Sequence, residues 1–189
     1  HQVAIVGSGP CGLAAAQQLN RVGYKVTVFE RDDAPGGLMR YGIPDFKFAK
    51  HQVDRRINQL LQEGIVFKTG IEVGKDVELP QLREQFSAVC LTIGAQQHRE
   101  VALPGRQSEG VLLGLPYLIA ANKTQAGQSM PDTWSAKGRN VLVLGGGDTG
   151  ADCVATAKRQ GAAKITQIDI NNQRPLKRNN DNPWPLLPM

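Results

Sequence analysis

The first thirty residues alternate between apolar and polar stretches in a recognisable order. Residues 3–6 form a continuous apolar run, which is typical of a strand buried in a parallel sheet. A glycine-rich turn follows, and the Ala-, Gln- and Leu-rich residues 13–22 predict a helix that ends at the next glycine. Residues 25–29 predict a second strand, and Glu30 stands at its end. This order predicts one strand–helix–strand unit.

The middle of the chain has a less regular pattern. The Gly and Pro content of residues 34–44 predicts a loop. Val53, Ile57, Leu60 and Leu61 form an apolar stripe that predicts an amphipathic helix over residues 48–63. The other expected elements are a strand over 65–68, a short helix over 79–86, a strand over 88–93, a helix over 113–122 and a polar connection over 124–137.

The opening order returns near the end of the chain. Residues 141–144 predict a strand, residues 151–159 a helix that Gly161 ends, and residues 164–170 a strand that contains Asp169. The repeated glycines are Gly7, Gly9 and Gly12, which recur 138 residues later as Gly145, Gly147 and Gly150. The sequence therefore predicts an α/β fold with two Rossmann-like dinucleotide-binding units, both of them incomplete.

Each glycine turn follows a strand, opens a helix and precedes an acid by about 20 residues, as a dinucleotide-binding fingerprint requires. The first glycine permits the tight turn, the second lets backbone approach a pyrophosphate, and the third lets helix and strand pack closely. The helix N-terminus offers N–H groups to phosphate, and Glu30 and Asp169 are placed to accept hydrogen bonds from ribose. One such turn is also compatible with a tight turn that binds nothing. Two copies favour two cofactors that exchange electrons, a flavin and a nicotinamide.

The second unit leaves the choice of nicotinamide cofactor open. Asp169 favours the free 2′-hydroxyl of NAD, unless it points into the sheet, whereas Arg174 and Arg178 favour the 2′-phosphate of NADP. The same two arginines are also compatible with a solvated loop. We expect NADPH, with NADH as the alternative.

Composition and charge narrow the class of protein. The 189 residues are 41% hydrophobic and 21% charged, which is ordinary for a globular chain and excludes a disordered charged tail. The chain has 21 glycines among its 189 residues, a larger share than the average of about 7%. The formal net charge is +5, but the basic residues are dispersed and do not interleave with aromatic ones. We therefore expect no nucleic-acid partner, and the lack of a long apolar run predicts no membrane partner.

Cysteine and histidine patterns disfavour metal and nucleophilic chemistry. The cysteines, Cys11, Cys90 and Cys153, are widely spaced and include no C-x-x-C, so neither a disulfide framework nor a zinc site is expected. Their apolar or small neighbours predict three buried free thiols in a reducing, cytoplasmic compartment. The histidines have no Ser or Cys partner at motif spacing: His1, His51 and His98. We expect no catalytic side chain and no metal ligand, because a cofactor would carry the chemistry.

The motifs resemble those of the glutamate synthase small-subunit family over nearly the whole chain. Residues 3–12, Glu30 and residues 36–44 resemble its FAD-binding half, and residues 145–153 resemble the start of its NADPH-binding part. The Asn-Pro-Trp-Pro segment at 182–185 is similar to the family segment after the second unit. The first two motifs also resemble those of the flavin region of dihydropyrimidine dehydrogenase, adrenodoxin reductase-like enzymes and NADH-dependent ferredoxin:NADP oxidoreductases.

The resemblance implies cofactor-binding residues in both units. For FAD it implies Gly7, Gly9 and Gly12 at the pyrophosphate with Gly94 nearby, Glu30 at the ribose, Gly37 and Leu38 along the flavin, Val73 at the adenine, and the neighbours Pro10 and Arg31. For NADPH it implies Gly145, Gly147, Asp148, Thr149 and Gly150, to which we add Arg174 and Arg178. Without the family, the alternative for Gly37 and Leu38 is a Gly-rich surface turn.

The resemblance also implies an electron path from NADPH to FAD, then to iron–sulfur clusters, and on to a large subunit that makes glutamate from 2-oxoglutarate and glutamine. Three scattered cysteines cannot hold a four-cysteine cluster, so the clusters are expected in a part of the parent protein outside this sequence. We expect a fragment with an FAD-binding domain at residues 1–105 that lacks its C-terminal completing segment. A connection at 106–137 and the start of an NAD(P)-binding domain at 138–189 would follow. The alternatives are a related flavin reductase, such as a ferredoxin:NADP oxidoreductase or a dihydropyrimidine dehydrogenase-like subunit, and a non-catalytic dinucleotide-binding fragment.

Overall fold

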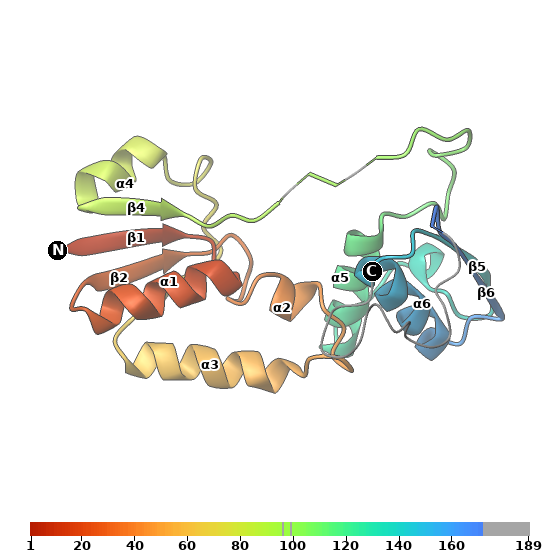
Figure 1. The fold of residues 1–189 in the computed structure, drawn as a ribbon, viewed down its shortest axis with the longest axis horizontal. Coiled ribbons are helices and arrows are strands. Elements are labelled where there is room, and N and C mark those ends of the chain that lie inside the picture. Colours follow the sequence, from red (N-terminus) through yellow and green to blue (C-terminus); the bar gives the residue numbers. More distant parts are fainter. Residues whose placement is uncertain (96, 99, 172–189) are drawn as a thin grey trace, which may run out of the picture. The chain divides into compact units, whose positions relative to one another are not determined.

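A computed structural model describes residues 1–95, 97–98 and 100–171 of the chain. The chain divides into two compact units, which we call unit 1 (His1–Ser135) and unit 2 (Ala136–Met189). The α/β fold with parallel strands that the sequence predicts is confirmed (Figure 1).

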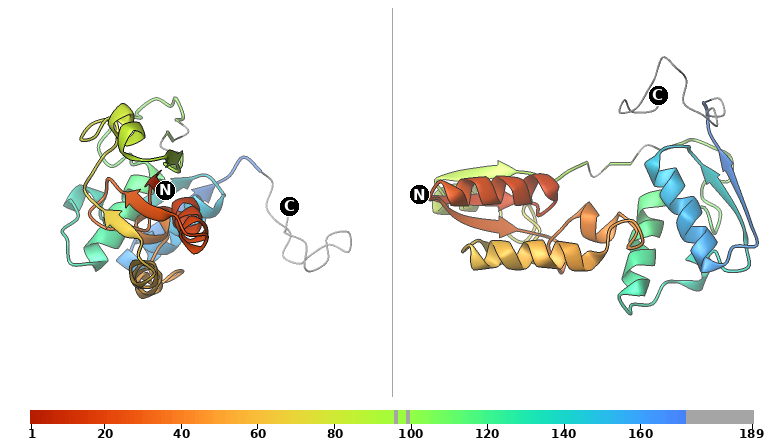
Figure 2. Two further views of the ribbon diagram at one scale, coloured as in Figure 1. Left: turned by 90° about the vertical axis from the view of Figure 1, so that its left-hand side faces the viewer. Right: turned by 60° about the horizontal axis from the view of Figure 1, so that its bottom comes forward.

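Unit 1 contains a four-stranded parallel sheet in the order β3-β2-β1-β4. Its strands are β1 (Gln2–Val6), β2 (Lys25–Phe29), β3 (Val66–Lys68) and β4 (Ala88–Leu91), and the central strand β1 pairs with both β2 and β4 (Figure 2). The carboxyl ends of β1 and β2 therefore lie at one edge of the sheet, where the first glycine turn and Glu30 follow them.

The helices of unit 1 depart from the sequence prediction in three places. They are α1 (Pro10–Arg21), α2 (Leu38–Tyr41), α3 (Lys50–Gln62), α4 (Leu79–Gln85) and α5 (Gly114–Gln125), with a 3₁₀ turn at Asp132–Trp134. The loop predicted over 34–44 contains α2, and α5 continues three residues beyond the predicted helix end at residue 122. Leu61 was predicted on the buried stripe of α3 but is 48% exposed, because the buried side passes through Val53, Ile57 and Leu60.

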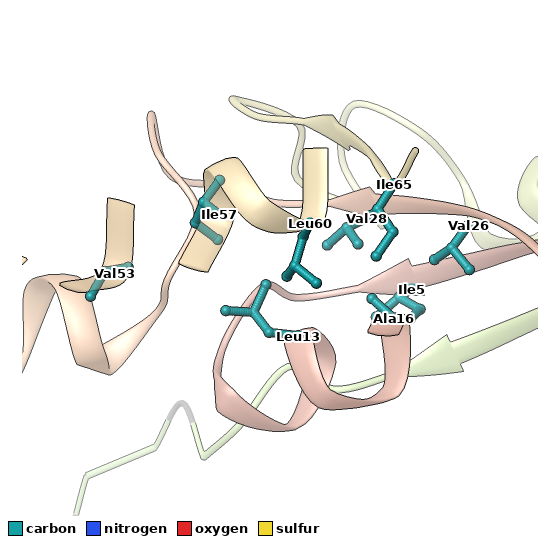
Figure 3. Close-up of a cluster of buried hydrophobic side chains, with 9 residues drawn as sticks. All are labelled: Ile5, Leu13, Ala16, Val26, Val28, Val53, Ile57, Leu60 and Ile65. Atoms are coloured by element: carbon teal, nitrogen blue, oxygen red, sulfur yellow. The ribbon is translucent and has the colours of Figure 1, made fainter. Parts of the chain in front are cut away.

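Two apolar layers hold the unit 1 sheet. Helices α1 and α3 cover one face (Figure 3), and the cluster between them and the sheet comprises Ile5, Leu13, Ala16, Val26, Val28, Val53, Ile57, Leu60 and Ile65. Leu82 of α4 covers the opposite face, over Ala4, Val6 and Phe29. Burying one such large aliphatic side chain stabilises a fold by about 1.5–3 kcal/mol. Packing on both faces of the sheet therefore fixes the positions of the ends of β1 and β2.

Unit 2 repeats the strand–helix–strand order on a smaller scale. Strands β5 (Asn140–Leu144) and β6 (Lys164–Ile168) pair in parallel, and α6 (Asp148–Gln160) connects them. Gly161 ends α6 in the left-handed conformation at φ +84°, which confirms the predicted cap. The last strand was predicted to contain Asp169, but β6 ends at Ile168. No helix among the described residues is both long enough and apolar enough to cross a membrane.

Candidate functional site

The turn between β1 and α1 is built so that two of its glycines cannot carry a side chain. Gly7 has φ +100°, and a Cβ there would lie 2.5 Å from the carbonyl oxygen of Thr92. A Cβ at Gly12 would overlap the carbonyl oxygen of Gly7. The Gly7 N–H donates to the Phe29 carbonyl at 2.8 Å, which fixes the turn beside the end of β2. Both glycines are therefore explained by packing within the turn, with no ligand needed.

Gly9 differs from its two neighbours in the turn. Its backbone is extended at φ −66°, ψ −178°, a conformation open to any residue, and a Cβ there would meet nothing within 4 Å. Gly9 is the N-cap of α1, whose first intrahelical bond runs from the Leu13 N–H to the Gly9 carbonyl at 3.0 Å. The N–H groups of Cys11 and Gly12 therefore have no acceptor within the helix. Open space beside unpaired N–H groups fits an anionic group such as a diphosphate.

Glu30 lies at the end of β2 and is only 6% exposed. Its Oε2 accepts hydrogen bonds from the Ser8 N–H at 3.0 Å and from the Ser8 hydroxyl, and its Oε1 accepts from the Asp32 N–H at 3.0 Å. A carboxylate has about four acceptor positions, so one remains on Oε1. These three bonds hold the Glu30 carboxylate in place and leave one position on Oε1 that can accept a hydrogen bond from a ligand hydroxyl. Arg31, beside it, is exposed.

The loop of residues 36–37 is brought directly onto the first glycine turn. Gly37 has φ +51°, and a Cβ there would lie 2.8 Å from the Cα of Gly9. The Gly36 N–H donates to the Ser8 hydroxyl at 2.9 Å, so one fully buried serine joins the turn, Glu30 and this loop. Leu38 follows with 53% of its surface exposed. Sequence reasoning missed Ser8, since only its small hydroxyl side chain inside the glycine motif hints at this role.

Two further predicted site residues flank the turn. Val73 packs its side chain against the cluster that contains Phe29 and Leu82, and it forms an isolated bridge with Val77. Gly94 is exposed beyond β4 at φ +67°. The Thr92 hydroxyl donates to the carbonyls of Val6 and Gly7 at 2.9 Å, which ties the end of β4 to the turn. Thr92 is a second residue that the sequence did not single out. Pro10 is exposed at the start of α1.

Asp32 and Asp33 follow Glu30, and hydrogen bonds of Tyr41 connect this acidic segment to α2. The Tyr41 hydroxyl donates to Asp33 Oδ1 at 2.6 Å and accepts from the Ala34 N–H at 3.1 Å. The first bond lowers the pKa of Asp33, while burial and the Asp33 carboxylate raise the pKa of Tyr41. Burial, followed by the Glu30 charge, raises the pKa of Asp32. A side-chain hydrogen bond therefore joins the segment after Glu30 to the short helix that follows Gly37.

The second glycine turn has the same division of roles. Gly145 has φ +121° and donates its N–H to the Ile168 carbonyl at 2.8 Å, and a Cβ at Gly150 would overlap the Gly145 carbonyl oxygen. Gly147, the N-cap of α6, has φ −77° and ψ −175°, and a Cβ there would again meet nothing within 4 Å. The repeated glycines thus share their geometry as well as their spacing. In both units the middle glycine alone has neither a positive φ nor a close contact at its Cβ position to explain it.

The acid of the second unit is placed differently from Glu30. Asp169 is exposed after the end of β6, and its Oδ1 accepts from the Asn171 N–H at 3.2 Å and from the Asn171 side-chain amide at 3.1 Å. Its Oδ2 lies where a Cβ of Gly146 would be, so a side chain at position 146 would displace the Asp169 carboxylate. Asp148 and Thr149 are exposed in the first turn of α6. Arg174 and Arg178 lie outside the described residues.

The burial of the three cysteines differs from the sequence prediction. All three are free, and the described residues contain no cluster of His, Cys, Asp and Glu that could hold a metal ion. Cys153 is buried, and burial followed by the Asp152 charge raises its pKa to about 11. Cys90 is partly buried, whereas Cys11 is exposed. The prediction of burial was wrong for Cys11 because this residue lies in the first turn of α1, on the open side of the glycine turn.

Comparison with known proteins identifies relatives over most of the chain. Residues 1–182 match the family model described as pyridine nucleotide-disulphide oxidoreductase. The chain is similar to the glutamate synthase [NADPH] small chain of Bacillus subtilis, with 51% identity over 189 residues that cover 99% of this chain and 38% of that protein. It is also similar to the glutamate synthase [NADH] of Schizosaccharomyces pombe, with 44% identity over 191 residues that cover 99% of this chain and 9% of that protein.

A solved structure supports the fold. FprA of Mycobacterium tuberculosis in complex with NADPH matches with a TM-score of 0.72 and 22% identity, over 88% of this chain and 42% of that one. The chain thus spans about two fifths of the bacterial relative and of this structural neighbour.

Proposed function

This chain belongs to the pyridine nucleotide-disulphide oxidoreductase family, and we propose that it is part of an FAD-dependent NADPH oxidoreductase of the glutamate synthase small-subunit type. The first glycine turn would bind FAD and the second would bind NADPH. The similarity at 51% identity to a protein named glutamate synthase [NADPH] small chain supports this choice within the family. Since the chain covers 38% of that relative, the activity is proposed for the whole protein.

One structural observation carries the proposal. Gly9 and Gly147 each cap a helix with ordinary backbone angles, and a Cβ at either position would meet no atom within 4 Å. A fold that needed no ligand at these points would tolerate a side chain in both. An approaching diphosphate explains why the side chain is missing twice, at equivalent places, beside unpaired helix N–H groups.

The residues of the first unit would bind and orient FAD. Gly9 and the N–H groups of Cys11 and Gly12 would meet the pyrophosphate, with Gly7, Pro10 and Gly94 forming the surrounding turn. The free acceptor position of Glu30 would take a ribose hydroxyl, with Arg31 at the rim and Val73 at the adenine. Gly37 and Leu38 would lie along the flavin ring. Their support is the contact of Gly37 with Gly9 and the exposure of Leu38.

The residues of the second unit would bind the nicotinamide nucleotide. Gly147 and the N–H groups of Thr149 and Gly150 would meet its pyrophosphate, beside Gly145 and Asp148. When both cofactors are bound, they would supply hydride transfer from nicotinamide C4 to flavin N5. The protein's own part would be to hold the two in place and exclude competing reactions.

We further propose the domain limits 1–105 for FAD binding and 138–189 for the start of NAD(P) binding, joined by 106–137. Electrons would leave through iron–sulfur clusters in another part of the parent protein to a glutamate synthase large subunit. The Bacillus subtilis relative is named a small chain, which supports the proposal of a large partner chain. The three free thiols support a reducing, cytoplasmic setting.

The preference for NADPH needs its own test, because similar proteins include one named for NADPH and one named for NADH. The full-length protein, loaded with FAD, is mixed anaerobically with each nucleotide, and the rate of flavin bleaching is followed. We expect NADPH to reduce the flavin at least tenfold faster at equal concentration. Faster reduction by NADH would overturn the role proposed for Arg174 and Arg178.

A second assay separates the glutamate synthase type from other flavin reductases. With the large subunit present, NADPH oxidation should depend on both glutamine and 2-oxoglutarate. If NADPH oxidation proceeds only with ferredoxin, the alternative of a ferredoxin:NADP oxidoreductase is correct. A protein that binds FAD but oxidises no nucleotide with any acceptor would be the non-catalytic alternative.

A further inference from the structure

Several backbone carbonyls in the short helix that follows Gly37 have no hydrogen-bond donor within that segment. Helix α2 has only four residues, and the last carbonyls of any helix lack partners within it. The Leu38 carbonyl accepts from the N–H groups of Gly42 and Ile43, at 2.9 and 2.8 Å. The carbonyls of Met39, Tyr41 and Ile43 are satisfied instead by side chains from two distant helices.

Lys50, the first residue of α3, supplies one of these side chains. Its ammonium donates to the carbonyl of Met39 at 3.0 Å, to that of Phe48 at 3.2 Å and to that of Ile43. An ammonium has three N–H donors, so all of them are used on backbone carbonyls. Burial lowers the pKa of Lys50, opposed by the charge of Asp45. A partly buried ammonium with three carbonyl acceptors fixes the positions of the backbone segments that meet at it.

Asn122 of α5 supplies the second side chain. Its amide nitrogen donates to the carbonyl of Tyr41 at 2.8 Å and to that of Ile43 at 3.0 Å. The Ile43 carbonyl therefore accepts from both Lys50 and Asn122. Helix α5 belongs to unit 1 but lies outside its strand–helix–strand motif, and no function was expected for it from the sequence. These bonds connect it to the segment beside the first glycine turn.

The opposite side of the same segment is also held by side chains. The Gly36 N–H donates to Ser8, and the Tyr41 hydroxyl donates to Asp33. Hydrogen bonds thus connect the segment of residues 37–43 to the glycine turn at one end and to α3 and α5 at the other. Leu38, which lies between these attachments, remains 53% exposed.

We propose that Lys50 and Asn122 are positioning residues that hold residues 37–43 against the flavin ring of bound FAD. This inference rests on the proposed function, since it takes FAD as the ligand of the first glycine turn. Neither side chain is assigned a contact with the flavin. Each acts through the backbone carbonyls of the segment that would carry that contact.

The test uses the full-length protein with three variants and two controls. Lys50→Met removes all three donors, Asn122→Ala removes two, and Asn122→Asp keeps the shape while replacing the donor with a charged acceptor. Lys75→Met and Asn58→Ala are the controls, because the Lys75 side chain is 74% exposed and Asn58 is exposed on α3. The FAD dissociation constant, the visible spectrum and midpoint potential of bound flavin, and the melting temperature of the FAD-free protein are measured.

We expect the FAD dissociation constant to rise about 10-fold for Asn122→Ala and about 100-fold for Asn122→Asp and Lys50→Met, each 10-fold step corresponding to about 1.4 kcal/mol. The spectrum or potential of the flavin that still binds should shift, while both controls match the wild type. NADPH binding should not change. Asn122→Ala keeps the Lys50 bonds, so it remains informative if Lys50→Met does not fold.

Two results would overturn the inference, and a third would overturn its premise. If the variants melt at lower temperature but bind flavin with unchanged affinity, spectrum and potential, the two side chains serve the fold alone. If Asn122→Ala and Asn122→Asp both bind FAD as tightly as the wild type, donation to the carbonyls is not what matters. If the wild-type protein itself does not bind FAD, the proposed function fails.

Discussion

Replacing Gly9 by valine separates ligand binding from folding at a single position. The backbone of Gly9 is extended, and a Cβ there would meet no atom within 4 Å. The change should therefore alter the stability of the ligand-free protein by no more than about 1 kcal/mol, the range expected for N-cap changes and exposed substitutions. The side chain would instead fill the space in front of the unpaired N–H groups of α1.

The expected loss of affinity follows from those N–H groups. Hydrogen bonds to a charged group contribute about 1.5–3 kcal/mol each, and the valine would block the approach to those of Cys11 and Gly12. Losing two such bonds amounts to about 3–6 kcal/mol, or about a 10²- to 10⁴-fold weaker affinity for FAD. Purified Gly9→Val protein should be nearly colourless and should regain little flavin on titration.

Gly147→Val is the matched control, since Gly147 has the same open geometry at the start of α6. It should keep its flavin and lose affinity for NADPH, whereas Gly9→Val should keep its affinity for NADPH. Melting curves of the ligand-free proteins check that both variants fold. Wild-type flavin content in Gly9→Val, or loss of both nucleotides in both variants, would refute the reasoning.

Three other positions give further predictions. Gly12→Ala should destabilise the ligand-free protein by about 3 kcal/mol or more, measured by urea unfolding, because its Cβ would overlap the Gly7 carbonyl; an unchanged midpoint would contradict the turn geometry. Tyr41→Phe should cost under about 1 kcal/mol at pH 7, because Asp33 is exposed. The pKa of Asp33 is lowered in the folded state, so the part of this difference that comes from the Asp33 carboxylate should be present above about pH 4 and be lost as the pH falls through the lowered pKa. The part that comes from the Ala34 N–H bond should remain, so a difference that does not change between pH 7 and pH 2 would argue against the Asp33 bond. Iodoacetamide should modify exposed Cys11 before buried Cys153, and FAD should protect Cys11; equal rates with and without FAD would place the ligand elsewhere.

Local rules made much of the fold predictable from the sequence. The strands and helices around both glycine turns follow from short apolar runs and glycine positions, which act within a few residues. Gly161 is an example, since its place after a helix is enough to predict a left-handed cap. The short helix α2 was missed because glycines flank it, and its four residues show no period.

The supporting contacts of the site could not be predicted in the same way. Ser8 bonds to Glu30 across 22 positions of sequence, and Asn122 bonds to Tyr41 across 81. Such pairs depend on how the layers of the unit pack, which a single sequence does not specify. The distinction between Gly9 and its neighbours Gly7 and Gly12 is similar, because the motif marks all three alike and only the surrounding atoms separate them.

The most direct test of the account is the visible absorbance of the purified full-length protein during anaerobic addition of NADPH. The account predicts a yellow protein with about one FAD per chain, whose flavin absorbance bleaches on addition of NADPH and returns when an electron acceptor is supplied. A protein that stays colourless after incubation with FAD, or whose bound flavin remains oxidised with excess NADPH, would contradict it.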